Sequence, residues 1–162
     1  MKHNGRRSIH RVFAGMLLTL MLVCCTVCAQ AATFTCIVAD GQYVNVRNRA
    51  SSTASTWGIL HHGDTIEAKP GEIINGYFKT MFEDRIAYVS VRFFETPVGK
   101  DYEVAANGRV RVRKSPAGDA SGFVQPGDTV HVYAWRYASN GSKWARCKGG
   151  KYVAAEYLEL IQ

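Results

Sequence analysis

Val44-Asn45-Val46-Arg47 points to the architecture of this chain, because its pattern returns as Val110-Arg111-Val112-Arg113 in the later part of the chain. In both stretches valines alternate with polar or charged residues, and this period of two is typical of a half-buried β-strand. Two further blocks repeat in the same order and at nearly the same offset: residues 58–66 return as 122–130, and residues 87–94 return as 151–158. The sequence therefore predicts an internal duplication, which largely determines the architecture.

Each predicted copy is about 65 residues long, near the smallest size at which a domain folds alone. We place the first copy at residues 33–97 and the second at residues 98–162, joined around residues 96–101. The join is too short for a flexible tether, so we expect the two domains to touch.

Local patterns inside each copy favour strands and turns rather than helices. Residues 77–82 and 86–89 predict a hairpin, and residues 144–148 and 151–153 predict a second one with a tighter turn at Gly149-Gly150. No stretch after residue 32 has a helical period. We therefore expect an all-β fold of two small barrels.

The repeated blocks resemble the bacterial SH3-like domain of secreted and cell-wall proteins. That family opens with V-N-V-R, continues through a glycine-containing turn and an aromatic followed by a basic residue, and ends with G-Y-V and Y-L. Here the matches include Val44 to Arg47 and Tyr77 to Lys79 in the first copy, and Val110 to Arg113 in the second. Ala87 and Lys151 replace the family's glycine before Tyr-Val. The resemblance implies two tandem SH3-like β-barrels.

Residues 1–31 have the three parts of a secretory signal peptide. Four basic residues lie between Met1 and Arg11, an uncharged, mainly apolar run covers residues 12–29, and Ala29-Gln30-Ala31 supplies the small residues of a cleavage site. The run is just long enough to cross a bilayer, so an uncleaved anchor is the alternative. We expect the protein to be secreted, and cell-wall association is compatible with secretion. We expect membrane attachment only if the signal is retained.

Composition and charge exclude two classes of protein. Of the 162 residues, 47% are hydrophobic, which excludes wholesale disorder. Cleavage removes four basic residues, which leaves sixteen Lys and Arg against thirteen Asp and Glu, so the net charge falls from +7 to +3. Because strong nucleic-acid binding needs more clustered positive charge, we expect no nucleic-acid partner. The second copy has ten basic and six acidic residues, and the first has six and seven. The two copies are therefore not expected to bind alike.

Cys36 and Cys147 are the two cysteines that remain after cleavage. In an oxidising exterior they could form a disulfide that closes a long loop. The alternative is that both are small buried hydrophobic residues. The sequence leaves both possibilities open.

No arrangement of residues predicts catalysis, a metal or a cofactor. His61, His62 and Asp64 lie within one turn and lack the separated ligands of a zinc site. A Cys–His dyad would have to combine His131 with Cys36 or Cys147, and Cys147 lies at a strand position where the first copy has a threonine. We therefore expect a non-catalytic protein.

The first candidate for ligand contact is a predicted enlarged loop in the second copy. Trp135 and Tyr137 flank Arg136, and we expect the two rings to share one side. Exposed rings can stack on sugar or peptide faces while Arg136 donates hydrogen bonds. Packing in the core is the alternative.

The second candidate is a basic face on the strand 110–113, where Arg111 and Arg113 point away from the valines together with Arg109. Its alternative is a charged edge that prevents aggregation. Asn45, Arg47 and Tyr77 complete the candidate ligand-binding residues of the first copy. By resemblance, the ligand is a cell-wall polymer or the peptide of peptidoglycan; the alternative is an extracellular interaction or scaffold module that binds a secreted or surface polypeptide.

Overall fold

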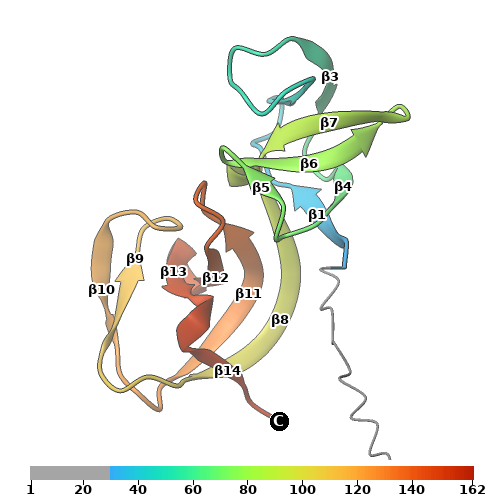
Figure 1. Cartoon of the computed structure of the whole chain (residues 1–162). Coiled ribbons are helices and arrows are strands. Elements are labelled where there is room, and N and C mark those ends of the chain that lie inside the picture. Colours follow the sequence, from blue (N-terminus) through green and yellow to red (C-terminus); the bar gives the residue numbers. More distant parts are fainter. Residues whose placement is uncertain (1–29) are drawn as a thin grey trace, which may run out of the picture.

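The computed structural model describes residues 30–162, and most of the predicted signal peptide, residues 1–29, lies outside the described part. The described chain is all β with short 3₁₀ turns, so the predicted class is confirmed. Figure 1 shows the strands in chain order. Their bounds are β1 Ala32–Cys36, β2 Val44–Arg47, β3 Thr56–Leu60, β4 Thr65–Ala68, β5 Ile73–Ile74, β6 Tyr77–Phe82, β7 Arg85–Ser90, β8 Phe94–Val104, β9 Val110–Arg113, β10 Ala120–Val124, β11 Thr129–Tyr137, β12 Lys143–Cys147, β13 Lys151–Ala154 and β14 Leu158–Leu160.

The strands form two antiparallel sheets rather than two barrels. One sheet has the order β10-β9-β13-β12-β11-β8-β1-β4, with β14 beside β8, and the other has the order β3-β2-β7-β6-β5. Both orders end in free edges, so neither sheet closes on itself. The prediction of closed barrels is wrong in this respect. A barrel needs its first and last strands to pair, and local sequence patterns do not reveal that pairing.

The two duplicated strands form as predicted. In β2, Val44 and Val46 are buried while Asn45 and Arg47 are half-exposed. In β9, Val110 and Val112 are buried, Arg111 is exposed and Arg113 is half-buried. The buried valines of β2 enter a core around Phe34, Phe78 and Phe94, and those of β9 enter a core with Val104 and Val153.

Both predicted hairpins are confirmed. β6 pairs with β7 from Tyr77 opposite Ser90 to Phe82 opposite Arg85, and the turn between them uses positive φ at Glu83 and Asp84. β12 pairs with β13 across the 3₁₀ turn η2, Lys148–Gly150, whose Gly149 and Gly150 have φ of 73° and 66°. Positive φ costs glycine little, which explains the tight second turn.

Equivalent turns in the two halves make the same backbone hydrogen bonds. Gly63 N–H donates to Cys36 O and Gly127 N–H donates to Val104 O, each over 2.9 Å. Each of these turns also has an aspartate that caps it. Asp64 Oδ2 accepts from His61 N–H and Asp128 Oδ2 accepts from Gln125 N–H, each over 2.7 Å. His61 and Asp64 are thus engaged in a turn. Within residues 30–162, no group of three His, Cys, Asp or Glu residues is placed to hold a metal ion.

The predicted join is the middle of a strand. β8 runs continuously through residues 96–101, with Gly99 at a φ of 63° where its pairing with β11 shifts register. Its beginning pairs with β1 and its remainder pairs with β11 and β14. Figure 1 shows β8 curving from the first half of the chain along the second half. The assignment of domains to residues 33–97 and 98–162 stays a prediction from the repeat.

Candidate binding groove

A cleft with a volume of about 730 Å³ lies on the second half of the chain. Three parts of the chain build it: strand β9 with the loop before it, the start of β12, and the 3₁₀ turn η3, Ala155–Tyr157. We call it the β9 groove. Its lining residues that bear charge or an aromatic ring are Arg109, Arg111, Arg113, Lys143, Trp144, Glu156 and Tyr157.

The β9 groove is strongly basic. Four cationic side chains line it, and Glu156 is the one acidic side chain among its lining residues. Arg109 and Arg111 are both exposed on the strand side of the groove. Such clustering of one sign of charge in a cleft raises the local potential and attracts anions. The groove therefore has the electrostatics of a site for a negatively charged ligand.

The three arginines of the groove differ in what holds them. Arg113 Nη1 donates to the carbonyl of Gly118 over 2.6 Å, and its guanidinium lies 5.7 Å from the centre of the Trp144 ring. Arg109 lies 4.4 Å from the centre of the Phe123 ring. Arg111 makes no side-chain hydrogen bond or ion pair with residues 30–162 in the structure. Its guanidinium is therefore the most available of the three.

Two aromatic residues contribute to the groove in different ways. Trp144 is only 8% exposed, and its indole N–H donates to Ser142 Oγ over 2.8 Å, so the polar atom of the ring is already satisfied. Tyr157 is 38% exposed. Tyr157 therefore offers a ring for stacking, while Trp144 forms a wall.

The predicted residues of the first half do not gather in an equivalent basic site. Arg47 Nη1 donates to the carbonyl of Ala54 over 2.6 Å, and Asn45 pairs opposite Ile59 in the sheet. A smaller cleft of about 440 Å³ lies nearby, with Arg49 and Tyr88 among its lining residues. Neither Asn45 nor Arg47 lines it.

The prediction of a loop at residues 135–137 is wrong, because these residues end strand β11. The ring of Trp135 lies edge-on to Tyr102, with centroids 5.3 Å apart, and Lys143 Nζ lies 4.2 Å from its centre. Burial lowers the pKa of Lys143 from its usual value. Tyr137 packs against Phe34 and Phe78 of the first core, at centroid distances of 5.8 and 5.9 Å.

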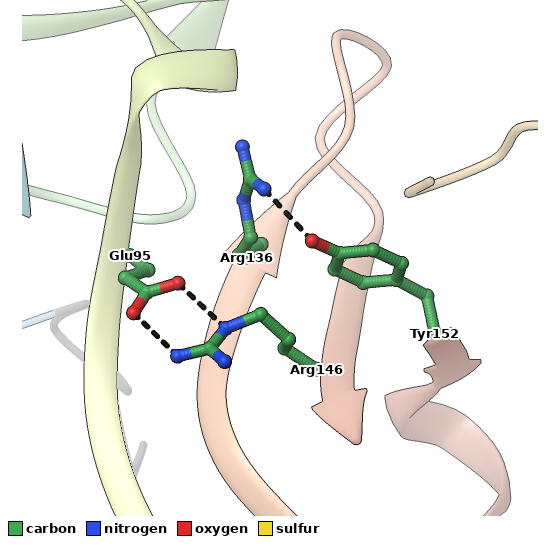
Figure 2. Close-up of polar contacts among 4 residues, drawn as sticks. All are labelled: Glu95, Arg136, Arg146 and Tyr152. Atoms are coloured by element: carbon green, nitrogen blue, oxygen red, sulfur yellow. Dashed lines mark hydrogen bonds and ion pairs between the residues drawn. The ribbon is translucent and has the colours of Figure 1, made fainter. Parts of the chain in front are cut away.

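Arg136 is held between the two halves. Its Nη1 donates to the hydroxyl of Tyr152 over 2.8 Å, as Figure 2 shows, and its Nη2 donates to the carbonyl of Arg92. Its Nε is buried without a partner in the described chain. The contacts of Trp135 and Tyr137 fit the alternative interpretation of residues 135–137, that these side chains pack in the protein rather than contact a ligand.

A cleft at the junction of the halves brings together three predicted site residues. Tyr77, Arg136 and Tyr137 line it, and its volume is about 440 Å³. The junction is also bridged by an ion pair: Arg146 Nε and Nη2 donate to the two carboxylate oxygens of Glu95 over 2.9 and 2.7 Å (Figure 2). Two cationic side chains line this cleft, Arg92 and Arg136, against four in the β9 groove, so this cleft is secondary to the β9 groove.

Cys36 and Cys147 are free thiols. Cys36 lies in the first core and Cys147 packs against the second, so the disulfide that the sequence left open is not formed. Burial raises the pKa of Cys36 and raises the pKa of Cys147 to about 11. Cys36 is thus a small buried hydrophobic group, and Cys147 is half-buried against the second core.

Cys147 and His131 line one cleft of about 360 Å³. His131 Nδ1 lies 2.6 Å from Asp101 Oδ1, a pairing that orients the imidazole. However, a nucleophilic cysteine needs a lowered pKa, and the pKa of Cys147 is shifted in the opposite direction. The arrangement therefore lacks an activated nucleophile.

Lys143 and Tyr157 are groove residues that the sequence did not reveal. Both lie 30 or more residues after Arg113 in the sequence, too far for a local sequence pattern to connect them with β9. Only the pairing of β12 with β13, and of β13 with β9, brings them to that strand. The family's closing Y-L motif matches Tyr157-Leu158 in the second copy, but the exposure of Tyr157 depends on the tertiary fold.

No family model and no curated protein matches this chain. Among solved structures, it is similar to NlpC2 and NlpC1 from Trichomonas vaginalis, each with a TM-score of 0.36. The identities are 10% and 12%, over 82% and 90% of this chain and 49% and 51% of those chains. It is also similar to the CBD of endolysin LysPBC5, with a TM-score of 0.30 and 16% identity over 82% of this chain and 95% of that one. This chain spans about half the length of the two NlpC chains.

Within residues 30–162, no helix has the length and apolar character needed to cross a membrane.

Proposed function

We propose that this chain is a secreted, non-catalytic binding protein of two tandem SH3-like domains, and that it recognises the bacterial cell wall. The β9 groove carries this proposal, because it combines a cleft of about 730 Å³, exposed guanidinium groups and an exposed tyrosine ring. Sugar and peptide ligands are bound by such combinations of stacking and hydrogen bonding. The strand block Val44–Arg47, its counterpart Val110–Arg113 and the closing pair Tyr157-Leu158, with their resemblance to SH3-like domains, support the choice of partner.

Two tandem domains are supported by the repeated turns. The hydrogen bonds around Gly63 and Gly127 match, and so do those of Arg47 and Arg113. Two weak sites on linked domains would gain avidity through their high effective concentration. The smaller cleft beside Arg49 would supply the second, weaker contact in the first half.

A non-catalytic role is supported by the state of the thiol that shares a cleft with His131. At neutral pH a thiol with a pKa of about 11 is almost wholly protonated, and the protonated form is a poor nucleophile. Secretion is supported by the three-part pattern of residues 1–31.

Co-sedimentation with purified bacterial cell walls tests the proposal. The secreted chain should pellet with the walls at physiological salt, and Tyr157→Ala should weaken retention by about three- to tenfold because one stacking ring is lost. Tyr43→Ala is the matched control, since Tyr43 is 56% exposed but lies outside the β9 groove. Failure of the unchanged protein to pellet would reject cell-wall binding.

A second candidate is an extracellular module that binds another polypeptide. Several large apolar side chains are exposed on the first half, and such side chains are common at protein contacts. Capture of one specific polypeptide, together with no retention on walls, would favour this candidate. The exposed residues are Tyr43, Trp57, Ile59, Ile74, Met81 and Ile86.

A further inference from the structure

The two halves of the chain differ where their duplicated strands face solvent. In the register of the repeat, Arg109 and Arg111 of the second half stand where the first half has Tyr43 and Asn45. The third position is different, because arginine occupies it in both halves as Arg47 and Arg113. The repeat thus separates two arginines found only in the second half from one that is common to both.

The arginine that is present in both halves, Arg47 in the first and Arg113 in the second, has a structural role. Arg47 binds the carbonyl of Ala54 and Arg113 binds the carbonyl of Gly118, both over 2.6 Å. Each is opposite a tyrosine in the sheet, Tyr88 or Tyr152. Because the same contact exists with and without a basic groove, this arginine fixes the turn after the strand and needs no ligand to explain it.

The two unique arginines have no such task. Arg109 makes a cation–π contact with Phe123, which is itself 49% exposed. Arg111 is exposed on the same face of the strand and has no side-chain partner within residues 30–162. Arg109 lies immediately before β9 and Arg111 is the second residue of β9, so in extended backbone their Cα atoms are about 7 Å apart. That spacing suits neighbouring oxyanions, each bound through two N–H donors.

We propose that the β9 groove recognises oxyanions repeated along a cell-wall polymer, with Arg109 and Arg111 as the binding groups and Arg113 as a positioning residue. The inference rests on the proposed wall-binding function and assigns its ligand chemistry. Carboxylate and phosphodiester groups are both suitable oxyanions. The first half, with tyrosine and asparagine at these positions, does not share this preference.

Fluorescence polarisation with labelled poly-L-glutamate, polyphosphate and neutral dextran tests the inference and separates the two sources of charge. At least one anionic probe should bind and dextran should not. Arg111→Ala should weaken binding by at least about tenfold, because each charge-assisted contact is strong. The double variant Arg109→Ala/Arg111→Ala should abolish it. Raising NaCl from about 0.05 to about 0.3 M should also weaken binding, since these exposed charges are screened.

The matched control removes two charges elsewhere. Lys79 and Lys100 are both exposed and lie outside the β9 groove, so Lys79→Ala/Lys100→Ala has the same net charge as the double arginine variant. Equal losses in both double variants would overturn the inference, because bulk charge would explain them. Binding confined to phosphatidylglycerol vesicles, with neither polymer bound, would also overturn it and assign the surface to membrane lipid.

The two proposals fail in distinguishable ways. Arginine-dependent binding of a soluble polyanion without retention on walls would support the oxyanion site and reject the wall-binding function. Retention on walls that is unchanged by Arg109→Ala/Arg111→Ala and by salt would support the function and reject the oxyanion site.

Discussion

Arg47 and Arg113 each donate a hydrogen bond to a carbonyl of the turn that follows their strand. Ala54, which supplies one of these carbonyls, is buried, so removing the donor leaves a desolvated acceptor without a partner. We expect Arg47→Ala and Arg113→Ala each to lower the free energy of unfolding by about 1–2 kcal/mol. Urea denaturation followed by fluorescence measures this loss.

Arg109→Ala is the control for these two variants, because Arg109 is exposed, makes a cation–π contact with Phe123 and makes no side-chain hydrogen bond within residues 30–162. Its effect on unfolding should be within about 0.5 kcal/mol. If Arg113→Ala leaves stability unchanged while it reduces polyanion binding directly, Arg113 is a ligand-binding residue rather than a positioning one.

The alkylation rate of the Cys147 thiol tests whether this residue is an activated nucleophile. Burial raises its pKa from 9.0 to about 11, so the thiolate fraction at pH 8 falls by about a hundredfold. We expect iodoacetamide to label Cys147 in the folded protein about a hundredfold more slowly than in the urea-unfolded protein. The folded rate should keep rising with pH up to about pH 11.

Peptide mass spectrometry distinguishes Cys147 from Cys36 in this experiment. Cys36 lies fully buried in the first core, so its labelling should be slower still. A folded-state labelling rate for Cys147 that reaches its plateau below pH 8 would contradict the raised pKa. It would also reopen the dyad with His131.

The hairpins and the duplicated strands could be predicted from the sequence because they depend on local chemistry. Alternating valines determine which side of β2 and β9 is buried, and Gly149-Gly150 accepts the positive φ of a tight turn. Such features need no knowledge of the rest of the chain. The basic face with Arg111 was predicted for the same reason.

The end of β11 could not be predicted in this way. The alternating sequence pattern predicted that the rings of Trp135 and Tyr137 lie on the same side of their segment. It could not reveal which residues these rings pack against. Tyr137 meets Phe34 and Phe78, which come from strands of the other half of the chain. The groove residues Lys143 and Tyr157 depend in the same way on long-range strand pairing.

Strand β8 is linked to β12 by the Glu95–Arg146 ion pair, whose carboxylate side chain is only 12% exposed. Glu95→Gln keeps the shape of the side chain but removes its charge, which leaves the guanidinium of Arg146 poorly compensated. We expect the free energy of unfolding to fall by about 2 kcal/mol. Thermal denaturation at neutral pH measures the effect.

Glu103→Gln provides the control on the same strand, because Glu103 is exposed and makes no ion pair in the described chain. Its melting temperature should match that of the unchanged protein. A similar loss of stability in both variants would mean that net charge, rather than the buried pair, explains the result for Glu95.

The two halves of the molecule are joined by a strand and by packing rather than by a linker. β8 contributes its beginning to pairing with β1 and its remainder to pairing with β11. Tyr137 carries an aromatic ring from β11 into the core of the first half. Such continuous contacts predict that the halves unfold together, and they fix the β9 groove relative to the first half.

Tyr137→Ala tests this coupling, because it removes the ring that the second half packs against Phe34 and Phe78. The cavity and the lost apolar contact should lower the free energy of unfolding by about 2–3 kcal/mol. The loss falls on the contact between the halves, so the single unfolding transition expected for the unchanged protein should broaden or separate into two. Calorimetry measures this as a van't Hoff enthalpy below the calorimetric enthalpy. Tyr133→Ala is the matched control, since Tyr133 lies on the same strand but is 41% exposed and outside the first core. If Tyr137→Ala lowers stability but keeps one sharp transition, β8 alone is sufficient to couple the halves.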